Sequence, residues 1–453
     1  MDREKIYNKL PIALQHAACS LEGWRLVRRR YGAEYREISH VLNERVRFSR
    51  HDLDNLQNLR LKRHLSSGKG SPYWAERFVR YHVRPDGDNP FDELKKLPIL
   101  TKGDVQQDSD RIRNPTINKD DLVSCHTSGT TGAGLVFSET AAAERERWAL
   151  WWRYRQWHGV SHNTWCGYFG GRSVVPLLQT TAPFWRMNYP GRQILFSGYH
   201  LSAETAPVYL DALDRLAPPW LHGYPSVLSL IAGYLQDRGR RLSKGPRVVT
   251  AGAENLLPQQ KQLIEEAFGC PVRQHYGQAE AVANISECVN GHLHVDEDYS
   301  FVEFVPLEHH ANVFRIVGTN WSNPAFPLFR YDTGDLVELC TPQLKCHVPG
   351  RTVGSIDGRR EDYVTLPNGA RIGRLDHIFK DLTHVREAQI YQPDRRALVF
   401  RIVKRDGYDA NSERQLLHEA RKRLGHDIGI TLEYVNALQR STTGKLRFVI
   451  SGV

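Results

Sequence analysis

A cluster of hydroxyl side chains and glycines at residues 123–134 is the part of the sequence best suited to binding an anion. Its centre consists of Thr127, Ser128, Gly129, Thr130, Thr131 and Gly132. Glycine lets backbone N–H groups turn toward an anion and approach it closely, and the hydroxyl groups add further donors. No Gly-Lys pair closes the loop, so it is not a P-loop. The segment predicts phosphate binding, and a plain surface turn is the alternative.

Charged residues in four later segments could act on the same phosphate groups. The segments read Tyr276-Gly277-Gln278-Ala279-Glu280, Tyr331-Asp332-Thr333-Gly334-Asp335, Gly358-Arg359-Arg360-Glu361-Asp362 followed by Gly369-Ala370-Arg371-Ile372, and Arg440-Ser441-Thr442-Thr443-Gly444-Lys445. Attack on a phosphate builds up negative charge, which cations and fixed dipoles stabilise. Taken singly, each charged residue is most simply a turn residue or a solvated surface charge. Only the resemblance of these segments, together with the loop, to the motifs of a known enzyme family makes them candidate site residues.

Buried strands and helices alternate from about residue 120 to residue 340, and these elements must position the segments. Residues 247–251 form an apolar run typical of a buried strand. A helical pattern follows, and Gly269 is suited to cap its end. A second strand is expected at residues 272–276. A strand, a helix and a strand in succession predict a parallel sheet flanked by helices.

The tail of the chain predicts a small unit of its own. Residues 388–391 and 397–402 flank a turn and predict a hairpin. Ser412 and Gln415 predict a capping box at the start of a helix. A last strand is expected at residues 430–435.

The predicted fold class is α/β. A large N-terminal domain of sheets flanked by helices, residues 1–357, is expected to begin with a mostly helical leader at residues 1–95. A small, mobile α+β C-terminal domain is expected at residues 358–453. A chain of 453 residues is too long for one ordinary core, which agrees with two domains.

Composition excludes several classes of function. The 61 basic and 51 acidic residues give a net charge of +10, but they are interspersed, and no nucleic-acid-binding module is present. Seven scattered cysteines do not form a secreted disulfide framework. Neither a secretory leader nor an apolar run of membrane-spanning length is found. A cytoplasmic protein with no nucleic-acid partner is therefore expected.

The five motifs, in this order, resemble the adenylate-forming superfamily of acyl- and aryl-CoA ligases, luciferases and peptide-synthetase adenylation domains. Residues 127–132 resemble its phosphate loop, and the segment ending at Lys445 resembles the motif that carries its catalytic lysine. The finer resemblance is to the phenylacetate-CoA ligase branch, including homologues from capsular polysaccharide biosynthesis. It rests on residues 97–102, 351–359 and 366–376.

The resemblance implies a role for each motif. Lys445 is the expected catalytic lysine between the substrate carboxylate and the α-phosphate, Glu280 is expected to hold Mg²⁺, and Arg371 to pair with ribose or phosphate oxygens. Asp335 is expected to accept hydrogen bonds from the ribose hydroxyls. The nucleotide-binding residues outside the loop are then Gly252, Ala253, Glu254, Tyr276, Gly277, Gln278, Asp335 and Arg359. The resemblance also implies that Glu361 and Asp362 form the hinge about which the C-terminal domain rotates between the two half-reactions.

Two departures from the superfamily pattern affect the phosphate site. Ala279 stands where the family has a threonine that contacts the α-phosphate. Residues 133–134 are Ala-Gly in place of the frequent Gly-Lys-Pro continuation. The loss of one hydroxyl costs about 0.5–3 kcal/mol. A slower enzyme that keeps the mechanism is therefore expected, with phosphate held by backbone N–H groups and hydroxyls of the loop.

A structural zinc site of some relatives is partly matched. The candidate ligands are Cys288, His294, Cys340 and Cys346. Cys340 is included as a replacement for a family cysteine at the position of Leu344, and His292 and His347 are further candidates. Cys₃His is an established zinc ligand set. Buried free cysteines are the simpler alternative.

The acyl pocket is expected at His222, Gly223 and Tyr224, where a tyrosine suits an aryl or otherwise flat acid. A second aromatic cluster comprises Trp148, Trp151, Trp152, Tyr154 and Trp157. At helical spacing, such a cluster is more often core than substrate pocket.

The predicted function is ATP-dependent activation of a carboxylic acid to an acyl-adenylate, followed by thioester formation with coenzyme A. ATP, Mg²⁺ and coenzyme A are the cofactors that the resemblance implies, with zinc as a structural addition. One alternative passes the acyl group to a carrier-protein thiol, an amine or a sugar. Another is a non-catalytic nucleotide-binding homologue. The identity of the acid and the formation of a homodimer stay open.

Overall fold

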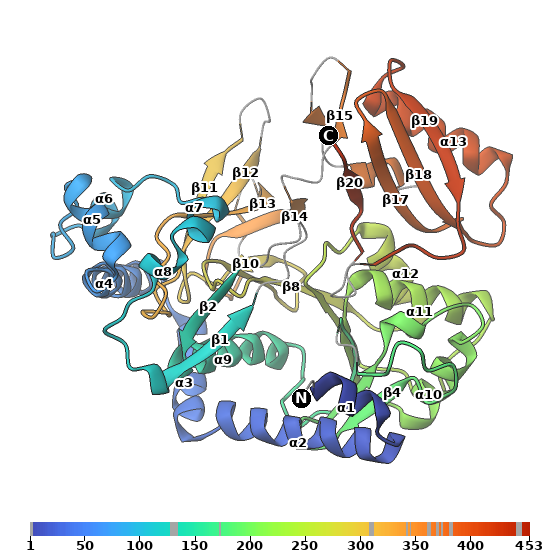
Figure 1. Ribbon diagram of the computed structural model, residues 1–453, viewed down its shortest axis with the longest axis horizontal. Coiled ribbons are helices and arrows are strands. Elements are labelled where there is room, and N and C mark those ends of the chain that lie inside the picture. Colours follow the sequence, from blue (N-terminus) through green and yellow to red (C-terminus); the bar gives the residue numbers. More distant parts are fainter. Residues whose placement is uncertain are drawn as a thin grey trace. The chain divides into compact units, whose positions relative to one another are not determined.

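The structure is a computed structural model that describes residues 3–126, 135–171, 174–307, 312–340, 343–344, 346–359, 364–367, 371–372, 375–379, 384–440 and 446–453. The chain forms two compact units, whose elements are labelled in Figure 1. The first unit comprises residues 1–25, 162–274 and 358–453, and the second unit comprises residues 26–161 and 275–357. No helix within the described ranges is long and apolar enough to cross a membrane.

The first unit contains a largely parallel sheet in the order β8-β7-β6-β3-β5-β4. Its strands are β3 (Cys166–Phe169), β4 (Trp185–Asn188), β5 (Gln193–Phe196), β6 (Trp220–Gly223), β7 (Val248–Gly252) and β8 (Val272–Gly277), of which β8 ends in the second unit. Strand β3 pairs in parallel with β5 and β6, β6 pairs in parallel with β7, and β4 is antiparallel to β5. The strand, helix and strand expected near residues 247–276 are confirmed. Gly269 ends the helix in the left-handed conformation, at φ +66°.

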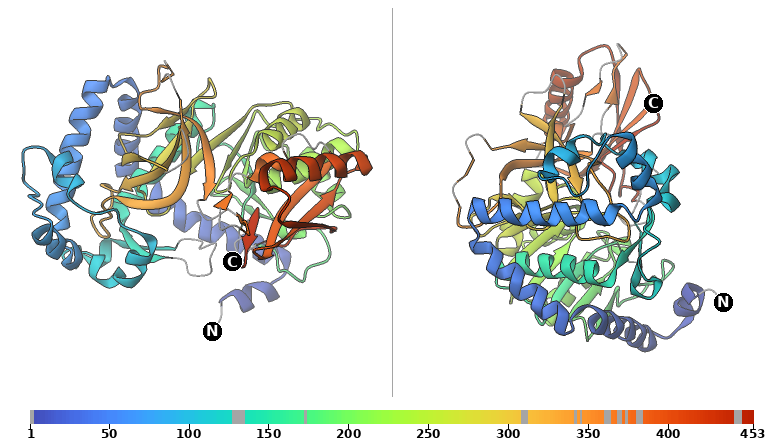
Figure 2. Two further views of the ribbon diagram at one scale, coloured as in Figure 1. Left: turned by 90° about the horizontal axis from the view of Figure 1, so that it is seen from above. Right: turned by 90° about the vertical axis from the view of Figure 1, so that its left-hand side faces the viewer.

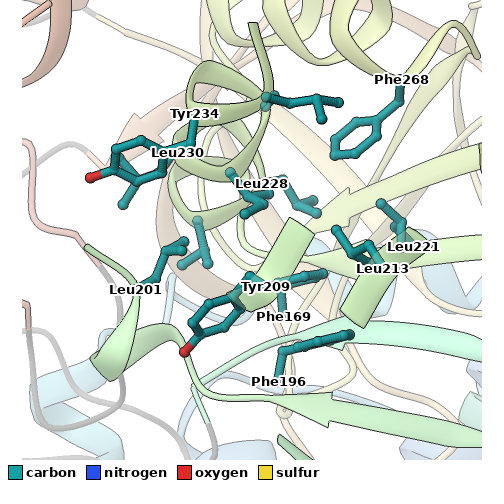
Figure 3. Packing of buried hydrophobic residues seen from close by; sticks show 14 of the residues in the cluster. Phe169, Phe196, Leu201, Tyr209, Leu213, Leu221, Leu228, Leu230, Tyr234 and Phe268 are labelled. Carbon is teal, nitrogen blue, oxygen red and sulfur yellow. The ribbon is translucent and has the colours of Figure 1, made fainter. Parts of the chain in front are cut away.

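Helices of the first unit pack on this sheet around the core shown in Figure 3. They are α10 (Ala206–Leu216), α11 (Pro225–Asp237) and α12 (Pro258–Phe268). The unit also contains α1 (Arg3–Lys9) and the first part of α2 (Ile12–Arg30). The rings of Phe169 and Phe196 stack with centroids 4.6 Å apart. Residues 225–235 of α11 are all buried. The start of α11, which follows the candidate acyl residues, is therefore fixed within the core.

The C-terminal part of the first unit has a core of its own. Its sheet has the order β19-β18-β17-β20 and consists of β17 (Val385–Asp394), β18 (Ala397–Lys404), β19 (Gly429–Tyr434) and β20 (Val449–Ser451). The short strands β15 (Val364–Thr365) and β16 (Arg371–Ile372) pair with each other. Helix α13 (Ala410–Leu424) lies against the larger sheet in Figures 1 and 2, where it buries Leu416 and Ala420.

The expected hairpin in this region is confirmed by the antiparallel pair β17 and β18. The expected capping box at Ser412 and Gln415 is wrong. Asp409 caps α13 instead, because its Oδ1 accepts hydrogen bonds from the N–H groups of Asn411 and Ser412. The strand expected to be the last is followed by β20.

The second unit begins with helices, as the polar leader predicts. Its helices are α3 (Ala33–Glu44), α4 (Arg50–Gly68), α5 (Pro72–Arg80), α6 (Pro90–Lys95), α7 (Lys102–Gln107), α8 (Ser109–Ile112) and α9 (Ala141–Trp157). Short 3₁₀ turns in the two units lie at Arg45–Arg47, Lys119–Asp121, Gly198–His200 and Leu375–Phe379. Helices α3 and α9 pack side by side (Figure 2, right). Arg60 of α4 pairs with Glu146 of α9 at 2.6 Å.

The sheet of the second unit has the order β11-β12-β13-β14-β10-β9-β8. Its strands are β9 (Asn284–Glu287), β10 (Leu293–Val295), β11 (Phe301–Pro306), β12 (Val313–Thr319), β13 (Tyr331–Leu339) and β14 (Thr352–Arg359). A separate antiparallel pair is formed by β1 (Leu122–His126) and β2 (Val136–Thr140). His126 pairs with Val136, so the two chain segments that flank the predicted phosphate loop lie side by side.

Candidate functional site

Several predicted site residues lie outside the described part of the chain. These are Thr127, Ser128, Gly129, Thr130, Thr131, Gly132, Glu361, Asp362 and Lys445. Arg359 and Arg371 lie in β14 and β16, and their side chains are also outside the described part. The roles expected for these residues stay predictions.

Three of the predicted nucleotide-binding residues meet in the second unit. The Tyr276 hydroxyl donates a hydrogen bond to Asp335 Oδ2 at 2.7 Å, and Gln278 Nε2 donates to the same oxygen at 3.0 Å. The side chains of Gln278 and Tyr276 also contact each other. Burial and then the charge of Asp335 raise the pKa of Tyr276, so the phenol stays protonated and remains a donor. The structure thus joins two motifs that are far apart in the sequence.

A turn in β13 positions Asp335. Gly334, at φ +75°, donates its N–H to Asp332 Oδ1 at 3.0 Å. Thr333 Oγ1 accepts the Asp335 N–H at 3.1 Å and donates to the carbonyl of Ile316 at 3.0 Å. The remaining Asp332 oxygen pairs with Arg315 at 2.8 Å. These side-chain bonds brace the turn between β12 and β13, while the Asp335 carboxylate contacts the Tyr276 and Gln278 side chains.

Glu280 lies directly after this cluster in the sequence. Its backbone carbonyl accepts a hydrogen bond from Asn320 Nδ2 at 3.0 Å, which fixes the chain at this point. The negative charge of Glu280 also contributes to the raised pKa of Tyr276, so its carboxylate acts on the same cluster. Magnesium usually keeps several waters and needs one or two protein carboxylates. Glu280 supplies one carboxylate near Tyr276, which is compatible in ligand type with its predicted role of holding magnesium.

A cavity of about 300 Å³ opens in the second unit beside Gly277, Gln278 and Ala279. Trp148 and Trp151 of α9 line it, so these two residues are not purely core as expected. The arginines in its wall are paired with acids. Arg147 bonds Glu139 at 2.5 Å, and Arg29 and Arg30 bond Glu144 at 2.7 and 2.8 Å. Arg29 and Arg30 share the one carboxylate of Glu144, so the three arginines and two acids leave the wall with one net positive charge.

The predicted acyl-pocket residues run from β6 into the start of α11 in the first unit. His222 Nδ1 lies 2.8 Å from Thr250 Oγ1. The Tyr224 N–H donates to the carbonyl of Phe169 at 3.0 Å. Gly223 has no room for a side chain, because a Cβ there would lie 2.4 Å from the same carbonyl oxygen. The close approach of β3 and β6 therefore requires the glycine.

Tyr168 is a candidate acyl-pocket residue that sequence reasoning missed. Its ring lies 5.7 Å from the ring of His222. Its charge also contributes to the raised pKa of Tyr224, for which burial is the main cause. Only the parallel pairing of β3 with β6 brings these residues together, and their sequence separation gives no sign of it.

Gly252 ends β7 in the first unit, and Ala253 and Glu254 follow it. Ala253 has φ +67°, a left-handed conformation that is uncommon for a residue other than glycine. Glu254 Oε2 accepts the N–H of Ser226 at 3.1 Å, and Oε1 accepts the N–H of Leu446 at 2.9 Å. Glu254 is thus bonded to the start of α11 and to the residue that follows Lys445 in the sequence.

A group of potential metal ligands occurs in the second unit. It consists of Cys288, His292, His294 and Cys346, whose ligand atoms all lie within 4.8 Å of one another. The two sulfur atoms are 3.8 Å apart. Two thiolates bound at about 2.3 Å to a tetrahedral zinc ion lie about 3.8 Å from each other. Both ring nitrogens of His294 are buried and have no hydrogen-bond partner within the described ranges, so the donor set fits zinc.

The membership of this group differs from the sequence expectation. Cys340 is not part of it, and His292 takes the fourth place. The turn between β9 and β10 explains the difference, because the Cys288 N–H donates to the His292 carbonyl at 2.8 Å and closes the turn. Cys288, His292 and His294 therefore come from one hairpin, and Cys346 comes from a later loop.

Comparisons with known proteins find related families over much of the chain. Residues 88–305 match the family model described as AMP-binding enzyme, and residues 364–452 match that of the CapK C-terminal domain. Protein CapK of Staphylococcus aureus is 28% identical over 459 residues, which cover 99% of this chain and 99% of that protein.

Solved structures show the same fold. The crystal structure of 2-hydroxyisobutyryl-CoA ligase in the postadenylation state, in complex with R3-HIB-AMP, has a TM-score of 0.70 at 17% identity. The match covers 90% of this chain and 91% of that one. The same ligase with 2-HIB-AMP and CoA in the thioesterification state has a TM-score of 0.54 at 17% identity, with the same coverage. The predicted fold class, a large sheet domain flanked by helices and a smaller C-terminal domain, is confirmed.

Proposed function

We propose that this chain, whose residues 88–305 match the AMP-binding enzyme family, is an adenylate-forming enzyme that converts a carboxylic acid and ATP into an acyl-adenylate and then transfers the acyl group to coenzyme A. The observation that carries this proposal is the hydrogen bond between Tyr276 and Asp335. It joins two superfamily motifs in the second unit and presents a carboxylate that can accept hydrogen bonds from ribose hydroxyls. Solved ligases of this fold hold acyl-AMP and CoA, which supports both half-reactions.

In the first half-reaction, an oxygen of the substrate carboxylate attacks the α-phosphorus of ATP, and the bond to the β-phosphate oxygen breaks. Pyrophosphate leaves with that electron pair. Lys445 is the cation proposed for the negative charge that develops at the α-phosphate, and Arg371 and Arg359 are proposed to bind ribose or phosphate oxygens. A magnesium ion held by Glu280 supplies further positive charge to the phosphates when bound.

In the second half-reaction, the sulfur of coenzyme A attacks the acyl carbon, and AMP leaves with the electron pair of the broken C–O bond. The thiol proton passes to solvent. Glu361 and Asp362 are proposed as the hinge between the two half-reactions. Sulfur attack needs a different arrangement of groups around the acyl carbon from the one that adenylate formation needs. Changes at these residues are therefore expected to slow the second half-reaction more than the first.

The substrate proposed is an aryl or otherwise flat acid. His222 lies in β6 and Tyr224 at the start of α11, and the ring of Tyr168 lies beside that of His222. Aromatic side chains supply large, flat apolar surfaces to a ligand. A panel of aryl and small aliphatic acids, tested by ATP–pyrophosphate exchange, measures the first half-reaction directly.

The acceptor is tested with the acid that supports exchange. AMP release that speeds up on addition of coenzyme A, with acyl-CoA as the product, is the expected result. If pyrophosphate exchange persists but the rate of AMP release does not change with coenzyme A, the acceptor is instead a carrier-protein thiol, an amine or a sugar. Absence of exchange with every acid would point to a non-catalytic nucleotide-binding protein.

Lys445→Ala is the matching test of the catalytic lysine. We expect exchange to fall by about a hundredfold or more, since the variant removes a charge that acts on the transition state. Lys404→Ala, a change at another lysine of the C-terminal region, is the control and is expected to keep exchange. Equal exchange rates in both variants would refute the assignment of Lys445.

A further inference from the structure

The first turn of α11 has a carboxylate where a capping side chain is normally found. Tyr224 occupies the capping position but makes no side-chain cap, and the N–H of Ser226 donates to Glu254 Oε2 at 3.1 Å. The first N–H groups of a helix lack partners within the helix, and the helix dipole favours a negative charge at this end. Glu254 is thus held in place by the start of α11.

The second oxygen of Glu254 bonds a different part of the chain. Oε1 accepts the N–H of Leu446 at 2.9 Å, across 192 residues of sequence. One carboxylate therefore bridges two main-chain N–H groups, each of which uses a separate oxygen. Because a charged acceptor makes the stronger kind of hydrogen bond, this bridge is a firm connection between α11 and the chain at Leu446.

A second contact reaches the start of α11 from the other side of residues 441–445. Arg440 Nη1 donates to Ser226 Oγ at 2.6 Å, and Arg440 Nη2 donates to Glu387 Oε1 at 2.5 Å. Ser226 and Glu387 are 4% and 9% exposed, so these bonds are shielded from water. Arg440 and Leu446 flank residues 441–445. Arg440 bonds Ser226 at the start of α11, and Leu446 bonds the Glu254 carboxylate that caps this helix.

We propose that Glu254 and Ser226 are positioning residues that hold both sides of the segment carrying Lys445 during acyl-adenylate formation. This inference rests on the proposed function, in which Lys445 acts in the first half-reaction. Ser226 lies two residues after the candidate acyl residue Tyr224, and Glu254 directly follows the candidate nucleotide-binding residue Ala253. Through them, Arg440 and Leu446 are bonded next to residues proposed to bind the substrates.

The other end of α11 provides an internal control. Asp237 pairs with Arg405 at 2.8 Å and also with Arg386, so it likewise connects α11 to the C-terminal sheet. These contacts do not involve residues next to Lys445. If docking of the C-terminal sheet in general were what matters, Asp237→Asn and Glu254→Gln would have similar effects. If the bridge to Leu446 matters, only Glu254→Gln affects the first half-reaction strongly.

The test compares the wild type, Glu254→Gln, Ser226→Ala and Asp237→Asn in the full-length protein. Glutamine keeps the size of Glu254 but presents an NH₂ group to one of the two N–H donors. We expect pyrophosphate exchange to fall about tenfold to a hundredfold in Glu254→Gln, by a smaller factor in Ser226→Ala, and less than about threefold in Asp237→Asn. Conversion of supplied acyl-adenylate by coenzyme A is expected to fall by a clearly smaller factor than pyrophosphate exchange in Glu254→Gln.

Amide hydrogen exchange at Leu446 gives a readout that does not depend on activity. Faster exchange at Leu446 in Glu254→Gln, and no change there in Asp237→Asn, is the expected result. Undiminished pyrophosphate exchange in Glu254→Gln, or an equal loss of both half-reactions, would overturn the inference while the proposed function stands. If the wild type makes no adenylate at all, the proposed function itself fails, and the Leu446 measurement still reports whether the bridge exists.

Discussion

Tyr276 and Asp335 are joined by a hydrogen bond of 2.7 Å between the phenolic hydroxyl and Oδ2 of the carboxylate. Gln278 donates to the same oxygen, so two side chains of one motif fix the orientation of an acid from another. A carboxylate held in this way needs no reorientation when it accepts hydrogen bonds from a ligand, which lowers the entropy cost of binding.

Tyr276→Phe tests this orientation. The variant removes one hydrogen bond to a charged acceptor and leaves the ring in place. We expect the KM for ATP in the exchange assay to rise about threefold to tenfold, which corresponds to about 0.5–1.5 kcal/mol. Asp335→Asn should raise it more, since the charge itself is lost. Unchanged KM values in both variants would contradict a role of this pair in nucleotide binding.

Zinc content tests the ligand group of the second unit. Elemental analysis of the purified protein is expected to find about one zinc per chain. Cys288→Ser, Cys346→Ser and His292→Ala should each lose most of it, and chelation should lower the melting temperature. Cys340→Ser is the matched control, because Cys340 lies outside the group, and it should retain zinc. A zinc-free wild type would favour the alternative of free cysteines.

Local sequence patterns predicted the elements whose evidence is contiguous in the chain. The apolar run at residues 247–251, the helical pattern after it and Gly269 are neighbours in sequence, and the structure confirms them. The cap of α13 was misassigned because Ser412 has a hydroxyl that could cap a helix, but it occupies the fourth position of the capping box and not the first. Only the bonds to Asp409 distinguish the first position of the box from its fourth.

Contacts between distant segments could not be predicted in the same way. His292 joins the ligand group because a turn folds it back onto Cys288, and the spacing alone did not favour it over Cys340. The bond from Leu446 to Glu254 has no sequence signature either, since a main-chain N–H carries no residue identity. The motifs located the candidate site, and tertiary packing determined which residues support it.

The pH dependence of the unfolding free energy tests the lowered pKa of the buried His64 in the second unit. Burial, and then the charge of Arg60, lower the pKa of His64 from 6.5 to about 3. Between these two values the unfolded chain binds a proton that the folded chain does not, so stability falls as the pH drops below about 6.5. One such proton contributes about 1.4 kcal/mol per pH unit.

His64→Gln should therefore flatten the dependence of the unfolding free energy on pH. Urea unfolding at pH 7 and pH 5 is the measurement, and the difference between the two values is expected to be smaller in the variant by about 1–2 kcal/mol. His275, whose pKa is also lowered to about 3, keeps a similar dependence in both proteins. Identical pH dependence in the wild type and the variant would show that His64 is protonated in the folded state as easily as in the unfolded one.

Replacement of glycine by alanine is expected to have opposite effects on the unfolding free energy at Gly223 and at Gly233. In Gly223→Ala, the new methyl group would lie 2.4 Å from the carbonyl oxygen of Phe169, so β3 and β6 must move apart. We expect a loss of about 1–3 kcal/mol in unfolding free energy. In Gly233→Ala, the nearest atom is Leu263 Cδ2 at 4.0 Å, an ordinary contact, and alanine favours the helix by about 0.5–1 kcal/mol. Urea unfolding of both variants measures the sign of each change in unfolding free energy. If Gly233→Ala destabilised the protein as much as Gly223→Ala, the strand spacing would not be what requires a glycine at position 223.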